Sequence, residues 1–172
     1  MLAFADLLEV VPEIAVPIRD RLLSTSLAIL GTLRSDGSPR LSPIEVTFFG
    51  GGLYMGMMPG SLKCIDARRD PRVCVLTPVA DKDDVGGEGK LFGMLREVTQ
   101  DAARLDVLRH AVAGLDIDPS LFGDSPVFEV LVDAAAWQHV EDETFVTLSW
   151  NSTDGVRLRH RVGPTGHPVD ID

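Results

Sequence analysis

The side chains that suit anion binding gather in one short run of this sequence. Lys63, one of only three lysines, follows Gly60 and Ser61, a pattern that predicts a short helix over residues 62–69 with Ser61 as its N-cap. The unpaired N–H groups and the dipole at a helix N-terminus favour a negative group, and the Lys63 ammonium adds a full charge. The run therefore predicts an anion site at Ser61, Leu62 and Lys63.

Other reactive residue types show no arrangement typical of a metal or hydrolase site. The histidines are dispersed without metal-ligand spacing, and no GxSxG elbow or Cys–His pair is present. Cys64 and Cys74 lie ten residues apart and are expected to be reduced thiols. The cluster of Arg68, Arg69 and Arg72 is interpreted as forming surface ion pairs. We expect no metal, and no catalytic residue can be named.

Length and composition set limits on the class of protein. A chain of 172 residues with 45% hydrophobic and 24% charged residues is expected to form one domain over residues 1–172. Its net charge of −10 argues against nucleic acid and anionic membranes as partners. No apolar run is long enough to span a bilayer, and the acidic N-terminus does not resemble a signal peptide, so a cytoplasmic protein is expected.

Turn residues and hydrophobic patterns predict the elements that would position these side chains. The N-terminal segment, residues 1–25, is expected to be helical, with Pro17 separating a second piece over residues 18–24. Three strands follow, joined by glycine-containing turns: residues 27–33, 39–49 and 53–57. The other expected strands are 73–77, 90–98, 126–140, 144–149 and 155–162. Residues 101–113 are expected to form a helix, 81–89 an acidic loop and 163–172 a loose tail.

This order of elements predicts a mainly β protein with short helices, a six-stranded antiparallel split β-barrel with Greek-key-like connections. Within it, Gly93 is expected to mark a bulge or a close backbone approach.

Residues 27–76 resemble the pyridoxamine 5′-phosphate oxidase-like, FMN-binding split-barrel superfamily. The marks are a strand–DGxP–strand hairpin at 36–39, the Gly-Ser-x-Lys run and Arg-Asp-Pro-Arg at 69–72. The stretch GMLREVTQD at 93–101 is similar to that family's fifth strand and following helix. The resemblance implies a homodimer with a flavin cofactor, FMN, bound between its subunits, and an oxidoreductase that acts on an unidentified small molecule.

Carried over by position, the resemblance also implies a set of cofactor-binding residues. One strand would lie along the flavin ring and phosphate, Gly56, Met57 and Met58 would pack on the cofactor, and the helix start would hold the phosphate. The full set is Ser42, Pro43, Ile44, Glu45, Val46, Thr47, Gly56, Met57, Met58, Ser61, Leu62 and Lys63.

The sequence departs from the vitamin B6 oxidases of that family at two cations and at its C-terminus. Those oxidases have basic residues at the positions of Ser42 and Thr47, so phosphate binding here would rest on Lys63, helped by Arg40 or one of the arginines at 68–72. Residues 149–163 look more like the oxidase-related bacterial members of unassigned substrate. The alternatives are a deazaflavin-dependent reductase and a non-catalytic flavin- or haem-binding barrel, with haem the least favoured.

Overall fold

A single antiparallel β-sheet dominates the chain. The computed structural model describes residues 1–79, 86–142, 144–162 and 166–171. This part has ten strands, and eight pair in the order β10-β9-β8-β7-β6-β5-β1-β2, while β4 pairs with β7 and β3. The strands are β1 (Leu27–Leu33), β2 (Pro39–Glu45), β3 (Thr47–Phe49), β4 (Gly52–Gly56), β5 (Arg72–Leu76), β6 (Glu88–Glu97), β7 (Val127–Glu141), β8 (Thr144–Asn151), β9 (Gly155–Val162) and β10 (Val169–Ile171).

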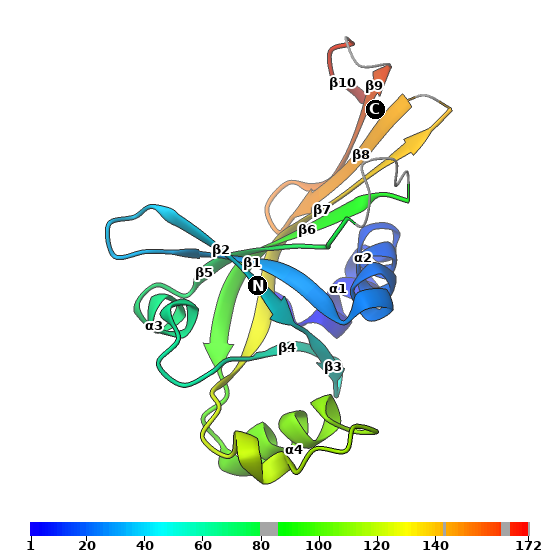
Figure 1. Cartoon of the computed structure of the whole chain (residues 1–172). Coiled ribbons are helices and arrows are strands. Elements are labelled where there is room, and N and C mark those ends of the chain that lie inside the picture. The colour runs from blue at the N-terminus through cyan, green and yellow to red at the C-terminus, as the bar shows by residue number, and fades with distance from the viewer. Residues whose placement is uncertain (80–85, 143, 163–165, 172) are drawn as a thin grey trace.

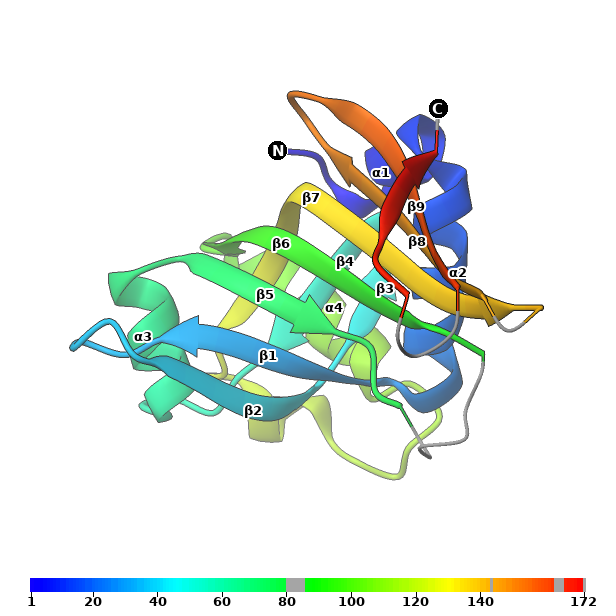
Figure 2. The ribbon, with the colours of Figure 1, turned by 90° about the horizontal axis from the view of Figure 1, so that it is seen from above.

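Helices lie on two sides of this sheet. They are α1 (Phe4–Val10), α2 (Pro12–Thr25), α3 (Leu62–Arg69) and α4 (Asp101–Ala111), with a 3-10 turn η1 (Pro119–Phe122). Figure 1 shows α1 and α2 together beside the sheet and α4 apart from them, beyond β3 and β4. Figure 2 shows β2, β1, β5, β6 and β7 side by side in that order. None of the described helices is both long enough and apolar enough to cross a bilayer.

The mainly β class with short helices is confirmed, but the six-stranded barrel is not. The sheet has ten strands in the described part of the chain and does not close. The 15-residue β7 accounts for much of the difference, because its first residues pair with β4 and its last residues pair with β8. One strand of this length therefore belongs both to the β3–β4 branch and to the β8–β9–β10 extension.

The predicted break at Pro17 is wrong, because α2 continues through this residue. The two helices instead separate at Val11, and Pro12 occupies the first turn of α2, where no backbone N–H is needed. The side chains of Ile14, Ile18 and Leu22 are fully buried. Burial of this apolar stripe offsets the hydrogen bond that Pro17 cannot donate.

Three further boundaries differ from prediction. The expected strand 39–49 is interrupted at Val46, which separates β2 from β3. Part of the expected loose tail forms β10, whose Asp170 accepts from Arg159 Nε at 2.5 Å. Most of the expected acidic loop and residues 163–165 lie outside the described residues, whereas Glu88 and Gly89 belong to β6.

The bulge predicted at Gly93 is confirmed. The pairing of β6 with β7 shifts register between Phe92 and Gly93. A Cβ at Gly93 would lie 1.9 Å from the Leu131 carbonyl oxygen. Only glycine fits this approach without movement of the backbone.

One large core lies between the sheet and α1–α2. It contains Met55, which is fully buried, and the indoles of Trp137 and Trp150. A second, small cluster joins Val107 and Leu108 of α4 to Val127 of β7. Both cysteines are free, as expected.

Candidate functional site

A cavity of about 190 Å³ lies between α4 and the segment that runs from β2 to β4. Its wall on the sheet side contains Glu45, Thr47, Gly56, Met57 and Met58. All five belong to the cofactor-binding set expected from the sequence. The opposite wall comes from α4, η1 and the start of β7, and contains Val107, Leu108, Ala111, Phe122, Ser125 and Val127.

Strand alternation explains which side chains reach this cavity. On β4, Leu53 and Met55 point into the core and are fully buried, so Gly56 faces the α4 side. A Cβ at Gly56 would meet Leu108 Cδ2 at 3.8 Å, and glycine keeps this part of the wall flat. Met57 is buried, whereas Met58 is 71% exposed and forms the rim. The result is an apolar slot with one charged lining residue, Glu45, among the described residues.

Alternation on β2 divides the remaining predicted residues. The side chains of Ile44 and Val46 are buried in the main core and do not line the cavity. Ser42 lies on the same inner face and is half-buried, while Pro43 and Glu45 are exposed on the outer face. The strand thus presents Glu45, rather than its apolar neighbours, to the cavity.

The N-cap of α3 follows Met58, at the cavity rim, by three residues of chain. Ser61 occupies the N-cap position, as predicted, but its hydroxyl makes no capping bond. Its Oγ is buried without a hydrogen-bond partner. Lys63 Nζ donates to the Pro43 carbonyl oxygen at 3.1 Å, and the first turn of α3 contains no acidic residue. An unsatisfied buried hydroxyl, an ammonium and a helix start are together suited to an anion.

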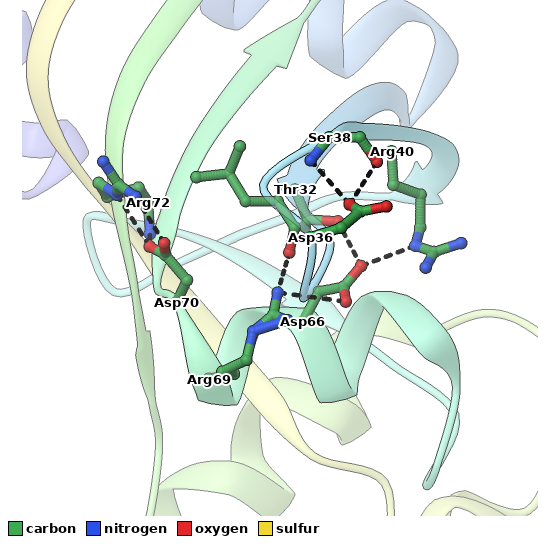
Figure 3. Close-up of polar contacts among 9 residues, drawn as sticks. Thr32, Asp36, Ser38, Arg40, Asp66, Arg69, Asp70 and Arg72 are labelled. Carbon is green, nitrogen blue, oxygen red and sulfur yellow. Dashed lines mark hydrogen bonds and ion pairs between the residues drawn. The ribbon is translucent and has the colours of Figure 1, made fainter.

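The arginines near this helix are engaged with carboxylates. Arg68 donates to Glu97 at 2.9 Å and Arg72 to Asp70 at 2.9 Å, which confirms the interpretation of these two as ion pairs. The hydrogen bond from Arg72 lowers the pKa of the Asp70 carboxyl to about 2. Figure 3 shows this pair and, beside it, the buried carboxylate of Asp66.

The wall formed by α4 and the start of β7 was missed by sequence reasoning. The near-helical spacing of apolar residues in 101–113, Leu108 among them, predicts only that this segment is a helix. Nothing in that spacing indicated which strands the helix faces, because the face follows from a long connection between β6 and β7.

Comparison with known proteins extends this picture at the level of fold. No family model and no curated protein matches the sequence. A solved protein from Clostridium acetobutylicum, related to general stress protein 26 of B. subtilis and of the pyridoxinephosphate oxidase family, is similar with a TM-score of 0.63 at 10% identity. The match covers 80% of this chain and 93% of that one. The chain has the pyridoxamine 5′-phosphate oxidase-like fold.

Other solved structures share the pyridoxamine 5′-phosphate oxidase-like fold with this chain. The conserved hypothetical protein Rv2991 from Mycobacterium tuberculosis matches with a TM-score of 0.60 and 22% identity, over 70% of this chain and 81% of that one. HutZ, the haem storage protein from Vibrio cholerae, matches with a TM-score of 0.58 and 13% identity, over 72% and 90%. Identities this low define the fold, and the cofactor must be argued from the site.

Proposed function

We propose that this protein is an FMN-dependent oxidoreductase that acts on a small molecule. The observation that carries the proposal is the buried, unpartnered Ser61 hydroxyl two residues before Lys63, in a chain segment whose preceding residues line an apolar cavity. Flavin mononucleotide combines an anionic phosphate with a flat, largely apolar ring. The candidate site offers an environment suited to each of these two parts.

The phosphate would be held at the start of α3. Ser61 Oγ can donate the hydrogen bond that it does not make within the protein, and the N–H groups of the first turn can donate beside it. The Lys63 ammonium donates to an uncharged carbonyl, that of Pro43, so its charge is available to an anion. These groups would fix one end of the cofactor.

The ring would lie along the wall from Glu45 to Met58. Met57, Leu108 and Phe122 would exclude water from it, while the Glu45 carboxylate can accept a hydrogen bond from a polar ring edge. A bound flavin supplies the redox chemistry itself, and the protein's part is to bind, orient and shield it. This division of labour is consistent with a site without an evident catalytic acid or base.

A second copy of the chain would complete the site. A cavity of about 190 Å³ is smaller than the roughly 300–1,000 Å³ of pockets that enclose small ligands. One cross-strand row on the outer sheet face joins Leu41, Gly31, Cys74 and Phe92. Leu41 is 74% exposed and Phe92 42%. Because Glu45 continues the outer face of β2 into the cavity, a partner covering this row would also border the cofactor.

The visible absorption spectrum of the protein purified without added cofactor tests the proposal, followed by titration with FMN. Flavin bands, or saturable quenching of FMN fluorescence at micromolar concentrations, are expected. A colourless protein that ignores FMN would contradict the proposal, and tight binding of a deazaflavin coenzyme would then indicate the related reductase. A Soret band would instead indicate haem, and the structural neighbour HutZ is a haem storage protein.

Ser61→Ala is a variant matched to the observation that carries the proposal. Because the hydroxyl makes no hydrogen bond in the protein, its loss should leave the melting temperature unchanged while FMN affinity falls. An ordinary N-cap serine would show the reverse, a loss of stability of about 0.5–2 kcal/mol.

A further inference from the structure

The proposed phosphate site has one cation, Lys63, while the positions of Ser42 on β2 and Thr47 on β3, basic in the vitamin B6 oxidases that the sequence resembles, carry no charge. A phosphate ester carries up to two negative charges, so a single ammonium leaves it incompletely neutralised. β2 does carry one arginine, Arg40, two residues before Ser42 and on the same face of the strand. It is the nearest cation along β2 to the position where a basic residue is expected and serine stands.

Arg40 reaches from β2 to α3. Its Nε donates to Asp66 Oδ2 at 2.7 Å, and its side chain remains 19% exposed. Figure 3 shows that the two terminal nitrogens of its guanidinium point away from Asp66. One nitrogen therefore fixes the group, while the terminal nitrogens are directed elsewhere.

Asp66, the residue that binds Arg40, is itself fixed by burial and by several contacts. It is 5% exposed, and its Oδ2 also accepts from Thr32 Oγ1 at 3.3 Å. Its Oδ1 lies 3.4 Å from the Arg69 guanidinium, which also donates to the Leu33 carbonyl. A carboxylate with partners on β1, β2 and α3 has little freedom to move, so the guanidinium of Arg40 is fixed as well.

Lys63 also connects α3 with β2. Asp66 follows Lys63 by three residues, a rise of about 4.5 Å along the helix axis. Lys63 Nζ donates to Pro43, three residues after Arg40 on β2. Hence β2 and α3 are joined at two points, one through the Lys63 ammonium and the other through the Arg40 guanidinium. The four groups Arg40, Lys63, Asp66 and Arg69 have a net charge of +2 in a chain whose net charge is −10.

We infer that Arg40 is a second ligand for the phosphate of the cofactor, and that Asp66 is a positioning residue that directs its guanidinium. The inference rests on the proposed FMN function. It explains how the protein can lack a basic residue at both Ser42 and Thr47. A cation on the same strand face, anchored by a carboxylate from α3, takes the place of the missing one.

FMN and riboflavin separate a phosphate ligand from a structural residue, because they share the ring and differ by the phosphate. The wild-type protein should bind FMN more tightly than riboflavin. Arg40→Gln should weaken FMN binding about tenfold or more and leave riboflavin binding unchanged, so the ratio of the two dissociation constants falls. Asp66→Asn should lower the same ratio by a smaller factor, because Arg40 keeps its charge but loses its anchor.

Arg69→Gln is the matched control, since Arg69 contacts the same carboxylate from the C-terminal end of α3. It should leave the ratio unchanged even if the melting temperature falls. The inference is overturned if Arg40→Gln weakens both ligands equally, or if Arg69→Gln lowers the ratio as much. A wild-type protein that binds neither ligand would instead refute the proposed function.

Arg40→Lys covers the case in which Arg40→Gln does not fold. A lysine cannot bind Asp66 and a phosphate in the same forked geometry, so a ratio between those of the wild type and Asp66→Asn is expected. A wild-type ratio in this variant, with Asp66 intact, would show that a fixed guanidinium is not needed and would overturn the inference.

Discussion

Lys63 places its ammonium 3.1 Å from the Pro43 carbonyl oxygen, an uncharged partner at the end of the neighbouring strand. Most other cations near α3 are engaged with carboxylates, as Arg68 and Arg72 are. A ligand phosphate would therefore find at Lys63 a charge that the fold itself does not neutralise.

Replacement of Lys63 by alanine should weaken FMN binding by about 1.5–3 kcal/mol, the usual range for a hydrogen bond to a charged group. Quenching of FMN fluorescence during titration measures the change. Lys90→Ala is the control, because Lys90 lies on β6 and pairs with Glu88. Unchanged affinity in Lys63→Ala would place the phosphate elsewhere.

Residue types predicted the start of α3 better than they predicted the walls of the cavity. The Gly60-Ser61-x-Lys63 run indicated the start of α3 correctly, since a helix start depends on local residues. Ile44 and Val46 were grouped with Glu45 and Thr47 by position in the resemblance, yet they face the core. Which face of β2 is covered depends on elements outside it, β4 among them, and no spacing within β2 shows that.

At the scale of elements, local signals predicted turns and strands well and missed the elements that distant contacts create. Gly37 has the positive φ of 81° expected for its hairpin. By contrast, β10 exists because three residues near the end of the chain pair with β9. α2 passes through Pro17 because its apolar face is buried. In both cases tertiary packing overrides the local preference.

The bulge in β6 should be the least tolerant position of the sheet. Gly93→Ala should lower the free energy of unfolding by at least about 3 kcal/mol, because the added carbon would lie 1.9 Å from the Leu131 carbonyl oxygen. Urea denaturation followed by circular dichroism measures the loss. Gly31→Ala on β1 should cost far less, since its nearest heavy atom would be 3.4 Å away. Equal losses in the two variants would contradict this account of the bulge.

The ion pair that ties α3 to β6 gives the stability of the protein an acid-dependent component. The hydrogen bond from Arg68 lowers the pKa of Glu97 below its ordinary value of 4.5 in the folded state. The stabilisation is therefore full above that ordinary value, and it is lost as the pH falls through the lower folded pKa.

Glu97→Gln should destabilise the protein by at most about 1 kcal/mol at pH 7, since the pair is partly exposed. The difference from the wild type should shrink as the pH falls below 4.5. Urea denaturation at pH 7 and at the lowest pH where both proteins stay folded compares them. A difference that grows towards acid pH would have the wrong sign for this pair.

For the whole molecule, the exposed row Leu41–Gly31–Cys74–Phe92 connects the cofactor proposal to assembly. An apolar row across four strands is typical of a surface that another protein covers, and Leu41 at its end lies on the same face of β2 as Glu45, which lines the cavity. The net charge of the chain does not predict this apolar row, because the row arises from the register in which β2, β1, β5 and β6 pair.

We expect a homodimer with twice the 18.6 kDa mass of the chain, and Leu41→Glu should shift it towards the monomer. Light scattering coupled to size-exclusion chromatography measures both masses. Leu23→Glu is the control, because Leu23 is 54% exposed on α2, away from the row. A monomeric wild-type protein at micromolar concentration would argue against a site shared by two subunits.

The position of Cys64 gives the protein an internal reporter of local opening. This thiol is fully buried directly after Lys63, whereas Cys74 is only half-buried, and burial raises the pKa of both thiols. A thiol reagent can reach Cys64 only when α3 detaches from the sheet, so its slow labelling phase reports the free energy of that detachment. A ligand that bridges α3 and β2 would slow this phase and leave the labelling of Cys74 unaffected. Labelling rates thus reveal how firmly the anion site is assembled, even without a coloured ligand.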